Sequence, residues 1–213
     1  MNTDVDQDLK IGVVGAGSWG TALANLLGSK GYPLDWWVYE TDVCRQIAKQ
    51  HENKVYLPGI TLSPNLRPSN DLAAVVSGKD LVLMVVPSHV MRETTQRMAQ
   101  AIGSETMVVS ASKGIENKTH LTMSGVIRET LSGLADDRLA VISGPSFARE
   151  VVRKAPTVVT VASRSLVTAE KVQHVFATPY FRVYSNQDMI GVELGGAVKN
   201  VIAIAAGVID GLG

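Results

Sequence analysis

The 213-residue sequence predicts an α/β fold in which helices cover both faces of a doubly wound, mostly parallel sheet. Apolar runs short enough to be strands alternate with helix-forming segments along most of the chain. The first of these runs, residues 11–14, enters a glycine-rich turn that opens a helix. A later run over residues 80–86 is almost continuously apolar, which is typical of a strand buried on both faces.

A GxGxxG spacing occupies residues 15–20, between the first predicted strand and its helix. In a dinucleotide-binding turn, Gly15 permits the sharp bend, Gly17 lets the backbone approach a pyrophosphate, and Gly20 lets the helix pack closely. The exposed N–H groups and the positive end of the helix then hold the phosphates. Glycines also mark ordinary turns, but the strand before and the helix after this one favour a Rossmann-like dinucleotide site.

Residues 34–39 predict a second strand, followed by a helix over residues 41–50 that carries Cys44 as a spare thiol. Glu40 lies about 20 residues beyond the glycines, where a carboxylate commonly binds the ribose hydroxyls of NAD and an arginine suits NADP. No basic residue follows Glu40 until Arg45. The sequence therefore favours NAD over NADP, although a solvated acid at the end of a strand is the alternative.

The chain then runs through an irregular, proline-bearing connection that includes Pro68, and through a short helix over residues 70–76. The buried strand over residues 80–86 ends at residues 87–89, Pro-Ser-His. Ligands of open parallel sheets gather beyond the carboxyl ends of the strands, so this tripeptide is expected near the cofactor. His89 is a candidate base, but it fits equally a residue that packs at the start of the next helix.

That helix is predicted over residues 91–102, and the strand that follows, over residues 106–110, ends shortly before Lys113. A compact ammonium at the ligand edge suits an anionic substrate or the neighbourhood of a nicotinamide. A lysine at a strand end is also often a plain solvated charge. The sequence leaves both roles of Lys113 open.

A helix over residues 120–131 leads to a strand over residues 139–142 and to the segment SGPSFA at residues 143–148. Pro145 suits a first helical turn, and Ser146 is expected to cap the helix that follows. The segment would then place a second cluster of backbone N–H groups at the ligand edge. An ordinary strand-to-helix turn explains it as well.

Strands over residues 156–162 and 181–184 flank a helix over residues 165–176 and extend the sheet in directions that the sequence leaves open. The closing segment, residues 188–210, predicts a long helix that is apolar almost all round and therefore buried. Its apolar stretch at residues 201–209 is far shorter than the roughly 20 residues that cross a bilayer. No membrane span is expected.

Lys199 is a charged residue within this apolar helix, and its side chain is expected to lie over the turn that holds Gly195 and Gly196. Burial of an unpaired ammonium favours the neutral amine, which suits proton exchange near neutral pH. The alternatives are a lysine that reaches the surface or one that pairs with Glu193. Glu193 lies six residues away on a different face of the helix, which disfavours the pair.

The composition points to a small-molecule partner. Hydrophobic residues make up 46% of the chain, charged residues 19%, and the formal net charge is zero. Bulk electrostatics therefore favour neither nucleic acid nor an acidic membrane surface. A single cysteine excludes an internal disulfide and fits a reducing, cytoplasmic compartment. Residues 1–9 make a poor signal peptide and are expected to form a frayed tail.

Six segments, in order along the chain, resemble the NAD(P)-dependent glycerol-3-phosphate dehydrogenases. They are GAGSWGTALA at residues 15–24, ENKVYLPG at 52–59, VPSH at 86–89, SKGIE at 112–116, SGPSFAREV at 143–151 and GGAVKNVIAIAAG at 195–207. The resemblance implies a dinucleotide-binding domain over residues 9–186. It also implies that residues 188–213 are the first helix of an all-helical C-terminal substrate domain whose remainder is largely absent.

The resemblance implies hydride transfer between NAD(P)(H) and sn-glycerol 3-phosphate or dihydroxyacetone phosphate, a cytoplasmic reaction that supplies glycerol 3-phosphate for phospholipid synthesis. Lys199 matches the proton donor or acceptor, and Lys113 matches a residue that touches both cofactor and substrate. Gly144 and Ser146 match substrate positions. The implied cofactor contacts are Gly15, Gly17, Ser18, Trp19, Gly20, Tyr39, Glu40, Lys113 and Ala148. A homodimer without a metal site is expected.

Two departures from the family pattern bear on these expectations. Tyr39 and Glu40 stand where bacterial relatives often carry a basic residue, which favours NAD over the NADP common among them. The sequence ends at Gly213, where the family continues into a helical domain with an arginine-asparagine pair for the substrate phosphate, so nucleotide binding without turnover is expected of this chain alone. The alternatives are another β-hydroxyacid-type dehydrogenase and a non-catalytic NAD(H)-binding sensor.

Overall fold

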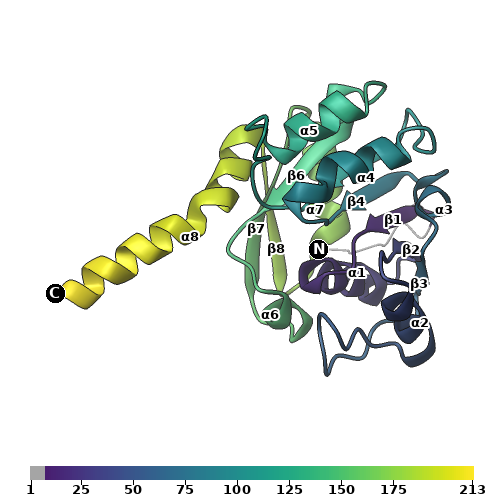
Figure 1. The fold of residues 1–213 in the computed structure, drawn as a ribbon, viewed down its shortest axis with the longest axis horizontal. Coiled ribbons are helices and arrows are strands. Elements are labelled where there is room, and N and C mark those ends of the chain that lie inside the picture. The colour runs from purple at the N-terminus through teal and green to yellow at the C-terminus, as the bar shows by residue number, and fades with distance from the viewer. Residues whose placement is uncertain (1–7) are drawn as a thin grey trace.

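The computed structural model describes residues 8–213, so most of the expected frayed tail lies outside the described residues. Within that range eight strands form one sheet in the order β3-β2-β1-β4-β5-β6-β7-β8 (Figure 1). The strands are β1 Ile11–Val14, β2 Leu34–Trp37, β3 Leu66–Ser69, β4 Leu81–Met84, β5 Met107–Ser110, β6 Leu139–Ser143, β7 Thr157–Ser163 and β8 Phe181–Asn186. Neighbouring strands run parallel except β6 and β7, which are antiparallel. The predicted doubly wound, mostly parallel sheet is confirmed.

Helices cover both faces of the sheet. They are α1 Ser18–Lys30, α2 Thr41–Gln50, α3 Leu72–Val76, α4 Met91–Met98, α5 Met123–Thr130, α6 Ala148–Val152, α7 Leu166–Phe176 and α8 Met189–Leu212, with 3-10 turns η1 Ser88–Val90 and η2 Asp136–Arg138. Alternate strand residues serve two cores: Ile11 and Val13 pack with α1, α2 and α7, whereas Val14 packs with α3, α4 and α5. Cys44 is buried on α2, and burial raises the pKa of its thiol.

Most predicted elements are present with slightly shorter bounds, but one strand was missed. Residues 66–69, expected to be irregular because of Pro68, form β3 at the edge of the sheet. Proline cannot donate to a ladder, and an edge strand has a free side that tolerates this loss. The two directions left open by the sequence are also settled, since β7 runs antiparallel to β6 and β8 runs parallel to β7.

The order of the strands reverses next to β1. The chain goes from β1 outward through β2 and β3 and then returns to β4 on the other side of β1. In open α/β sheets this reversal leaves a crevice beyond the carboxyl ends of the two central strands. Gly15 follows β1 and Val85 follows β4, so the glycine-rich turn lies at this crevice.

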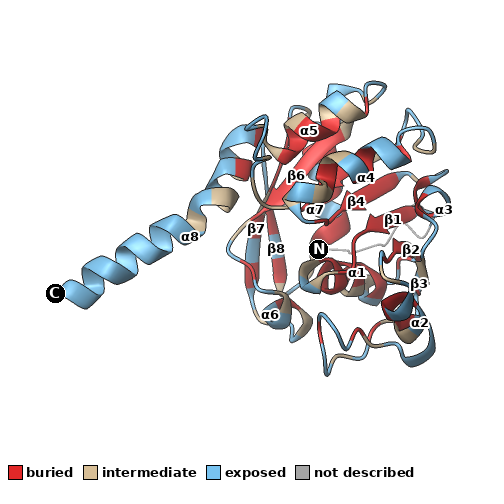
Figure 2. Ribbon diagram, viewed as in Figure 1, coloured by how far each residue is buried: buried red, intermediate tan, exposed pale blue. Residues whose placement is uncertain are grey.

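The helix α8 begins against the sheet and then leaves it (Figures 1 and 2). Met189 and Glu193 are buried, whereas all residues from 201 to 213 are exposed, with Ile209 72% exposed. The expected burial of the whole helix is therefore wrong, because no described segment covers its outer half. By length and composition alone α8 could cross a membrane, and 6% of its most apolar window is buried. Core helices and membrane spans share these properties.

Candidate dinucleotide and substrate site

The glycine-rich turn joins β1 to α1, and its three glycines meet different constraints. Gly15 has φ of 115°, and a Cβ there would lie 2.4 Å from the carbonyl oxygen of Val85. A Cβ on Gly20 would lie 2.3 Å from the carbonyl oxygen of Gly15, so the helix packs on the turn through bare backbone. A Cβ on Gly17 would meet nothing within 4 Å. The fold itself requires the first and third glycines, while the second leaves open space at the start of α1.

Buried hydrogen bonds from distant segments hold this turn. Asn53, which is fully buried, donates from Nδ2 to the carbonyl of Ala16 at 2.9 Å and to the hydroxyl of Thr21 at 2.8 Å. Trp36 of β2 donates from its indole N–H to the carbonyl of Gly15 at 2.9 Å. No side chain in the described part of the chain caps the N-terminus of α1. Its first N–H groups therefore remain available to an anionic ligand.

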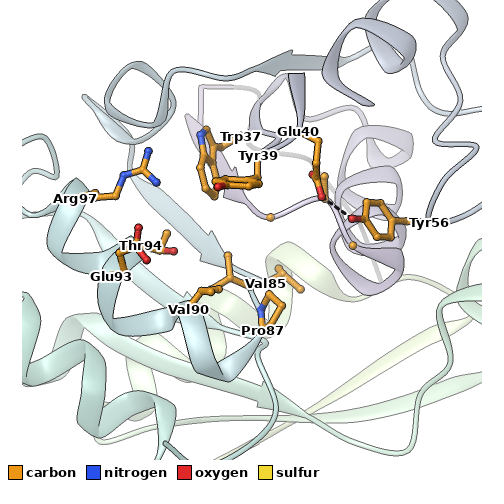
Figure 3. A pocket seen from close by; sticks show the side chains of 14 residues that line it. Trp37, Tyr39, Glu40, Tyr56, Val85, Pro87, Val90, Glu93, Thr94 and Arg97 are labelled. Carbon is orange, nitrogen blue, oxygen red and sulfur yellow. Dashed lines mark hydrogen bonds between the residues drawn. The ribbon is translucent and has the colours of Figure 1, made fainter. Parts of the chain in front are cut away.

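A cavity of about 230 Å³ opens beyond the carboxyl ends of β1, β2 and β4 (Figure 3). Its lining includes Gly15 and Gly17 of the turn, Trp37 at the end of β2, and the following Tyr39 and Glu40. Tyr39 is 71% exposed, and its ring meets that of Trp37 edge to face at 5.9 Å. The two residues that the sequence assigned to the adenosine part of a cofactor thus lie in one cavity with the glycines.

Tyr56 lies at one end of this cavity and holds Glu40. The phenol donates a hydrogen bond of 2.5 Å to Oε1 of Glu40, drawn as a dashed line in Figure 3. This hydrogen bond raises the pKa of Tyr56. Glu40 is therefore a positioned carboxylate rather than a freely solvated acid at the end of a strand.

A second cavity, of about 380 Å³, adjoins the first. It shares Gly17, Val85, Val86 and Pro87 with the first cavity, and its remaining lining residues are Ser18, Trp19, Gly20, Ala111, Ser112, Lys113, Ser146, Phe147 and Ala148. The two cavities together form a groove along the carboxyl edge of the sheet. All nine residues predicted to contact the cofactor line it.

Lys113 enters this groove after β5. Its ammonium donates to the carbonyl of Gly144 at 3.1 Å and lies 5.6 Å from the centroid of the Trp19 ring. Burial, together with the positive charge of Lys199, lowers the pKa of Lys113 to about 8. Of the two roles that the sequence left open, the plain solvated charge does not fit this environment.

Lys199 reaches the same region from α8. Its ammonium lies 5.3 Å from the centroid of the Phe147 ring, and Phe147 lines the groove. Lys199 also lines a third cavity, of about 220 Å³, with Gly144, Gly195 and Gly196, as expected from the lean of helical side chains. The lysine is half-buried rather than enclosed in an apolar helix, so the expected full burial is wrong.

Glu193 does not pair with Lys199. It is 8% exposed and accepts hydrogen bonds from the backbone N–H of Ser124 at 2.8 Å and from its hydroxyl at 2.5 Å. Ser124 lies in the first turn of α5, so Glu193 joins the root of α8 to the start of α5. The two lysines consequently face the groove region without this carboxylate.

The segment SGPSFA differs from its prediction in two respects. The helix α6 begins at Ala148, Phe147 occupies the N-cap position, and the hydroxyl of Ser146 donates to the carbonyl of Gly144 at 3.3 Å. Ser146 therefore does not cap α6, and Pro145 precedes the helix instead of entering its first turn. Ser146 and Ala148 still line the second cavity, and Gly144 lines the third.

His89 and metal chemistry find no support in the site. His89 is exposed on η1 and lines none of the three cavities. Over residues 8–213 no group of three or more histidine, cysteine or carboxylate side chains is placed to hold a metal ion. The groove instead combines open backbone at a helix N-terminus, apolar walls and the ammonium of Lys113, which fits an elongated dinucleotide.

Comparisons with protein families identify the chain. Residues 10–169 match the family described as NAD-dependent glycerol-3-phosphate dehydrogenase N-terminus, and residues 188–213 match the corresponding C-terminus. The chain belongs to the NAD-dependent glycerol-3-phosphate dehydrogenase family. The first matched region ends within α7, and the second begins at Asp188, the residue before α8, where the structure passes from the sheet to the projecting helix.

Curated glycerol-3-phosphate dehydrogenases [NAD(P)+] are similar along nearly the whole chain. The enzyme of Syntrophobacter fumaroxidans is 54% identical over 95% of this chain, and that of Syntrophotalea carbinolica is 49% identical over 96%. The chain spans 59% and 62% of the lengths of these relatives.

Solved structures of glycerol-3-phosphate dehydrogenases are also similar to this chain. The glycerol-3-phosphate dehydrogenase of Coxiella burnetii has a TM-score of 0.86 at 39% identity, covering 96% of this chain and 62% of that one. The Plasmodium falciparum enzyme has a TM-score of 0.88 at 28% identity, covering 97% and 60%. A UDP-D-ManNAc dehydrogenase from Pyrococcus horikoshii, at 13% identity over 92% and 50% and a TM-score of 0.73, shares the fold alone.

Three residues line the groove or hold its glycine-rich turn but were missed from the sequence. Asn53 and Tyr56 lie within the segment ENKVYLPG, whose family likeness was noted without assigning them contacts. Arg97 lies on α4 and lines the first cavity. No local signal marks Arg97, because the cavity joins it to β2 across a large separation in sequence.

Proposed function

We propose that this chain forms the cofactor-binding part of an NAD(P)-dependent enzyme that interconverts sn-glycerol 3-phosphate and dihydroxyacetone phosphate. The observation that carries the proposal is that Lys113 lies in the groove that begins at the glycine-rich turn, while Lys199 lies beside Phe147 of the same groove and close enough to Lys113 to lower its pKa. Residues 9–186 constitute the dinucleotide-binding domain. Residues 188–213 are the first helix of a C-terminal substrate domain.

Different groove residues contact different parts of the cofactor. The open backbone at Gly17 and the uncapped N–H groups of α1, near Ser18 and Trp19, hold the pyrophosphate. Tyr39 and Glu40 contact the adenosine part. Lys113 and Ala148 lie in the second cavity, which takes the nicotinamide half. The bound cofactor supplies or accepts a hydride at the nicotinamide, and the protein supplies orientation and charge.

Lys199 performs the proton transfer of this reaction. When the secondary hydroxyl of glycerol 3-phosphate is oxidised, neutral Lys199 accepts the hydroxyl proton as the hydride leaves the carbon. In the reverse direction the ammonium of Lys199 polarises the ketone and donates the proton. Lys113, Gly144 and Ser146 contact the substrate, and Lys113 offers a positive charge to its phosphate.

The partner is a small molecule, and the chain takes neither nucleic acid nor a metal ion. The enzyme is a cytoplasmic homodimer that supplies glycerol 3-phosphate for phospholipid synthesis. The apolar side chains of α8 serve packing rather than a membrane span. The names of the relatives and the match to the N-terminal family model support the small-molecule substrate.

The test follows the absorbance of NADH and of NADPH with dihydroxyacetone phosphate. It uses this chain and a longer polypeptide in which the chain continues into the C-terminal part of the Syntrophobacter relative. Turnover by the longer polypeptide supports the proposal. Turnover with 2-hydroxy or 3-hydroxy acids instead would indicate another β-hydroxyacid-type dehydrogenase. Cofactor binding without any turnover in either polypeptide would indicate a sensor.

A Lys199→Ala substitution tests the assigned proton transfer in the longer polypeptide. We expect kcat to fall by a factor on the order of 10² or more, with unchanged NADH affinity, because general acid–base catalysis commonly contributes that much. Lys171→Ala, which removes an exposed lysine on α7, is the control. A near-normal kcat in Lys199→Ala would contradict the role.

A further inference from the structure

The adenosine cavity holds a cation that the local sequence does not reveal. Arg97 of α4 lines the cavity together with Tyr39 and Glu40, although α4 lies far from β2 in the chain. Its guanidinium carbon lies 5.6 Å from the centroid of the Trp37 ring. Figure 3 shows Arg97 at one end of the cavity and the Glu40–Tyr56 pair at the other, with Trp37 and Tyr39 between them.

Arg97 takes this position instead of a nearby ion pair. Glu93 precedes it by four residues on α4, a spacing that favours a carboxylate–guanidinium pair on a helix. Among residues 8–213, however, no salt bridge involves Arg97, whereas Arg92 on the same helix is bound to Glu116 and Glu129. The guanidinium of Arg97 thus keeps its fork of N–H donors free at the rim of the cavity.

A dinucleotide can bring one kind of anion to this end of the groove. Its pyrophosphate belongs at the N-terminus of α1 beside Gly17, and adenine and an unmodified ribose are neutral. A phosphate on the 2′-oxygen of the adenosine ribose is the remaining negative group. A planar guanidinium matches the oxygens of a phosphate and binds it through paired hydrogen bonds.

We propose that Arg97 is the residue that recognises the ribose 2′-phosphate of NADP, so that the cavity accepts NADP as well as NAD. The inference rests on the proposed cofactor binding. Glu40, held by Tyr56, serves the 2′-hydroxyl of NAD, and in NADP the phosphate on that oxygen extends along the cavity toward Arg97. Glu40 and Glu93 also line the cavity and oppose a phosphate, so Arg97 is the charge that offsets them.

The test measures binding of NADPH and NADH by calorimetry, without turnover, in the unmodified chain and in Arg97→Gln. NADPH affinity is expected to fall about tenfold or more, the usual size of a lost charge-assisted hydrogen bond, and NADH affinity to change less than about twofold. Adenosine 2′,5′-bisphosphate should lose affinity in the same variant, whereas adenosine 5′-monophosphate should not. Added salt should weaken NADPH binding by the unmodified chain more than NADH binding, because it screens the interaction between Arg97 and the phosphate.

Two further variants sharpen the result. Arg97→Lys keeps the charge without the fork and should retain part of the NADPH affinity. Arg45→Gln is the matched control, because Arg45 is the basic residue nearest to Glu40 in sequence but lies outside the cavity lining. Its affinities for both nucleotides should be unchanged.

Several outcomes would overturn the inference. Equal losses of NADH and NADPH affinity in Arg97→Gln would mean that Arg97 stacks on the adenine common to both. If Arg45→Gln lost NADPH affinity selectively and Arg97→Gln did not, recognition of the 2′-phosphate would belong to Arg45. If the unmodified chain bound neither nucleotide, the proposed function would fail, and this inference with it.

Discussion

Gly17 and Gly20 lie three residues apart in the same turn, yet they are required for different reasons. A methyl group on Gly20 would lie 2.3 Å from the backbone oxygen of Gly15, which cannot move without opening the turn. A methyl group on Gly17 would project into open space at the start of α1. Gly20 is therefore needed for the turn to fold, and Gly17 is needed for a ligand to approach the backbone.

This contrast predicts that Gly20→Ala and Gly17→Ala separate stability from binding. Gly20→Ala should lower the free energy of unfolding by about 1–3 kcal/mol, the usual cost of overpacking. Gly17→Ala should lower it by less than about 1 kcal/mol, since a poorer N-cap is the main change, and should weaken NADH binding. Urea unfolding and NADH titration of both variants check the prediction. Equal stability losses in the two variants would refute it.

Lys113 makes anion binding depend on pH. Its pKa is about 8, so its ammonium is charged below that pH and neutral above it. We expect the affinity for NADH to fall as the pH rises through about 8, and Lys113→Gln to lose this dependence. Lys199→Gln should move the fall to higher pH, because the charge of Lys199 helps to lower the pKa of Lys113. NADH titrations between pH 7 and 9.5 test both statements, and an unchanged slope in Lys113→Gln would contradict them.

The residues that sequence predicted at the site are those whose role is set by their immediate neighbours. The glycines and Glu40 could be placed because the strand, turn and helix fix their surroundings within a short segment. Asn53, Tyr56 and Arg97 could not, since their partners Ala16, Glu40 and Trp37 lie on other elements. Their contacts depend on how the elements pack.

At the scale of single elements, α8 is secured through its first turns. Glu193 is buried and accepts two hydrogen bonds from Ser124 at the start of α5. At the start of α5 Thr122 accepts from the N–H of Gly125 and Glu193 accepts from that of Ser124, so the carboxylate contributes to capping that helix. The position of Lys199 six residues later depends on this junction.

We therefore expect Glu193→Gln to lower the free energy of unfolding by about 1.5–3 kcal/mol, the range for hydrogen bonds to a charged group. The amide can present only one acceptor oxygen, and its NH2 group cannot accept from Ser124. Asp210→Asn, at an exposed position on the same helix, should change stability by less than about 0.5 kcal/mol. Urea unfolding measures the free energy of unfolding of both variants. Equal values for the two would show that the Glu193–Ser124 contact does not stabilise the chain.

Local patterns were sufficient for nearly every helix and strand. Helix α2 could be predicted from residue 41 to residue 50 because its amphipathic pattern and length agree, although its N-cap, Glu40, makes no side-chain capping hydrogen bond. Strand β3 could not, because Pro68 argues against a strand wherever both edges are paired, and only the order of the sheet shows that β3 is an edge. Ser146 was misassigned as a cap because α6 begins one residue later than that cap would place it, with Phe147 at the N-cap.

At the scale of the whole molecule, the outer half of α8 exposes a row of large apolar side chains. Val201, Ile202, Ile204 and Ile209 are between 64% and 72% exposed. The apolar composition of the helix predicts that its surface is buried, but it does not identify the segment that packs against it. That is why the expected burial failed while the helix itself was predicted.

This exposure predicts that the 213-residue chain associates as its concentration rises. Replacing Ile202 and Ile209 by Glu should reduce the association, and NADH affinity should stay unchanged because neither residue lines the groove. Light scattering and NADH titration measure the two effects. A chain that remains monodisperse at high concentration would refute the prediction.

The anchoring of α8 at Glu193 has a mechanical consequence for Lys199. At 1.5 Å per residue, Lys199 lies about 9 Å along the helix axis from Glu193, whereas Leu212 lies about 28 Å away. If α8 swings as a rigid rod about that anchored end, the lysine travels about a third as far as the tip. The far end of α8 can thus shift considerably while the amine of Lys199 stays close to Phe147 at the groove.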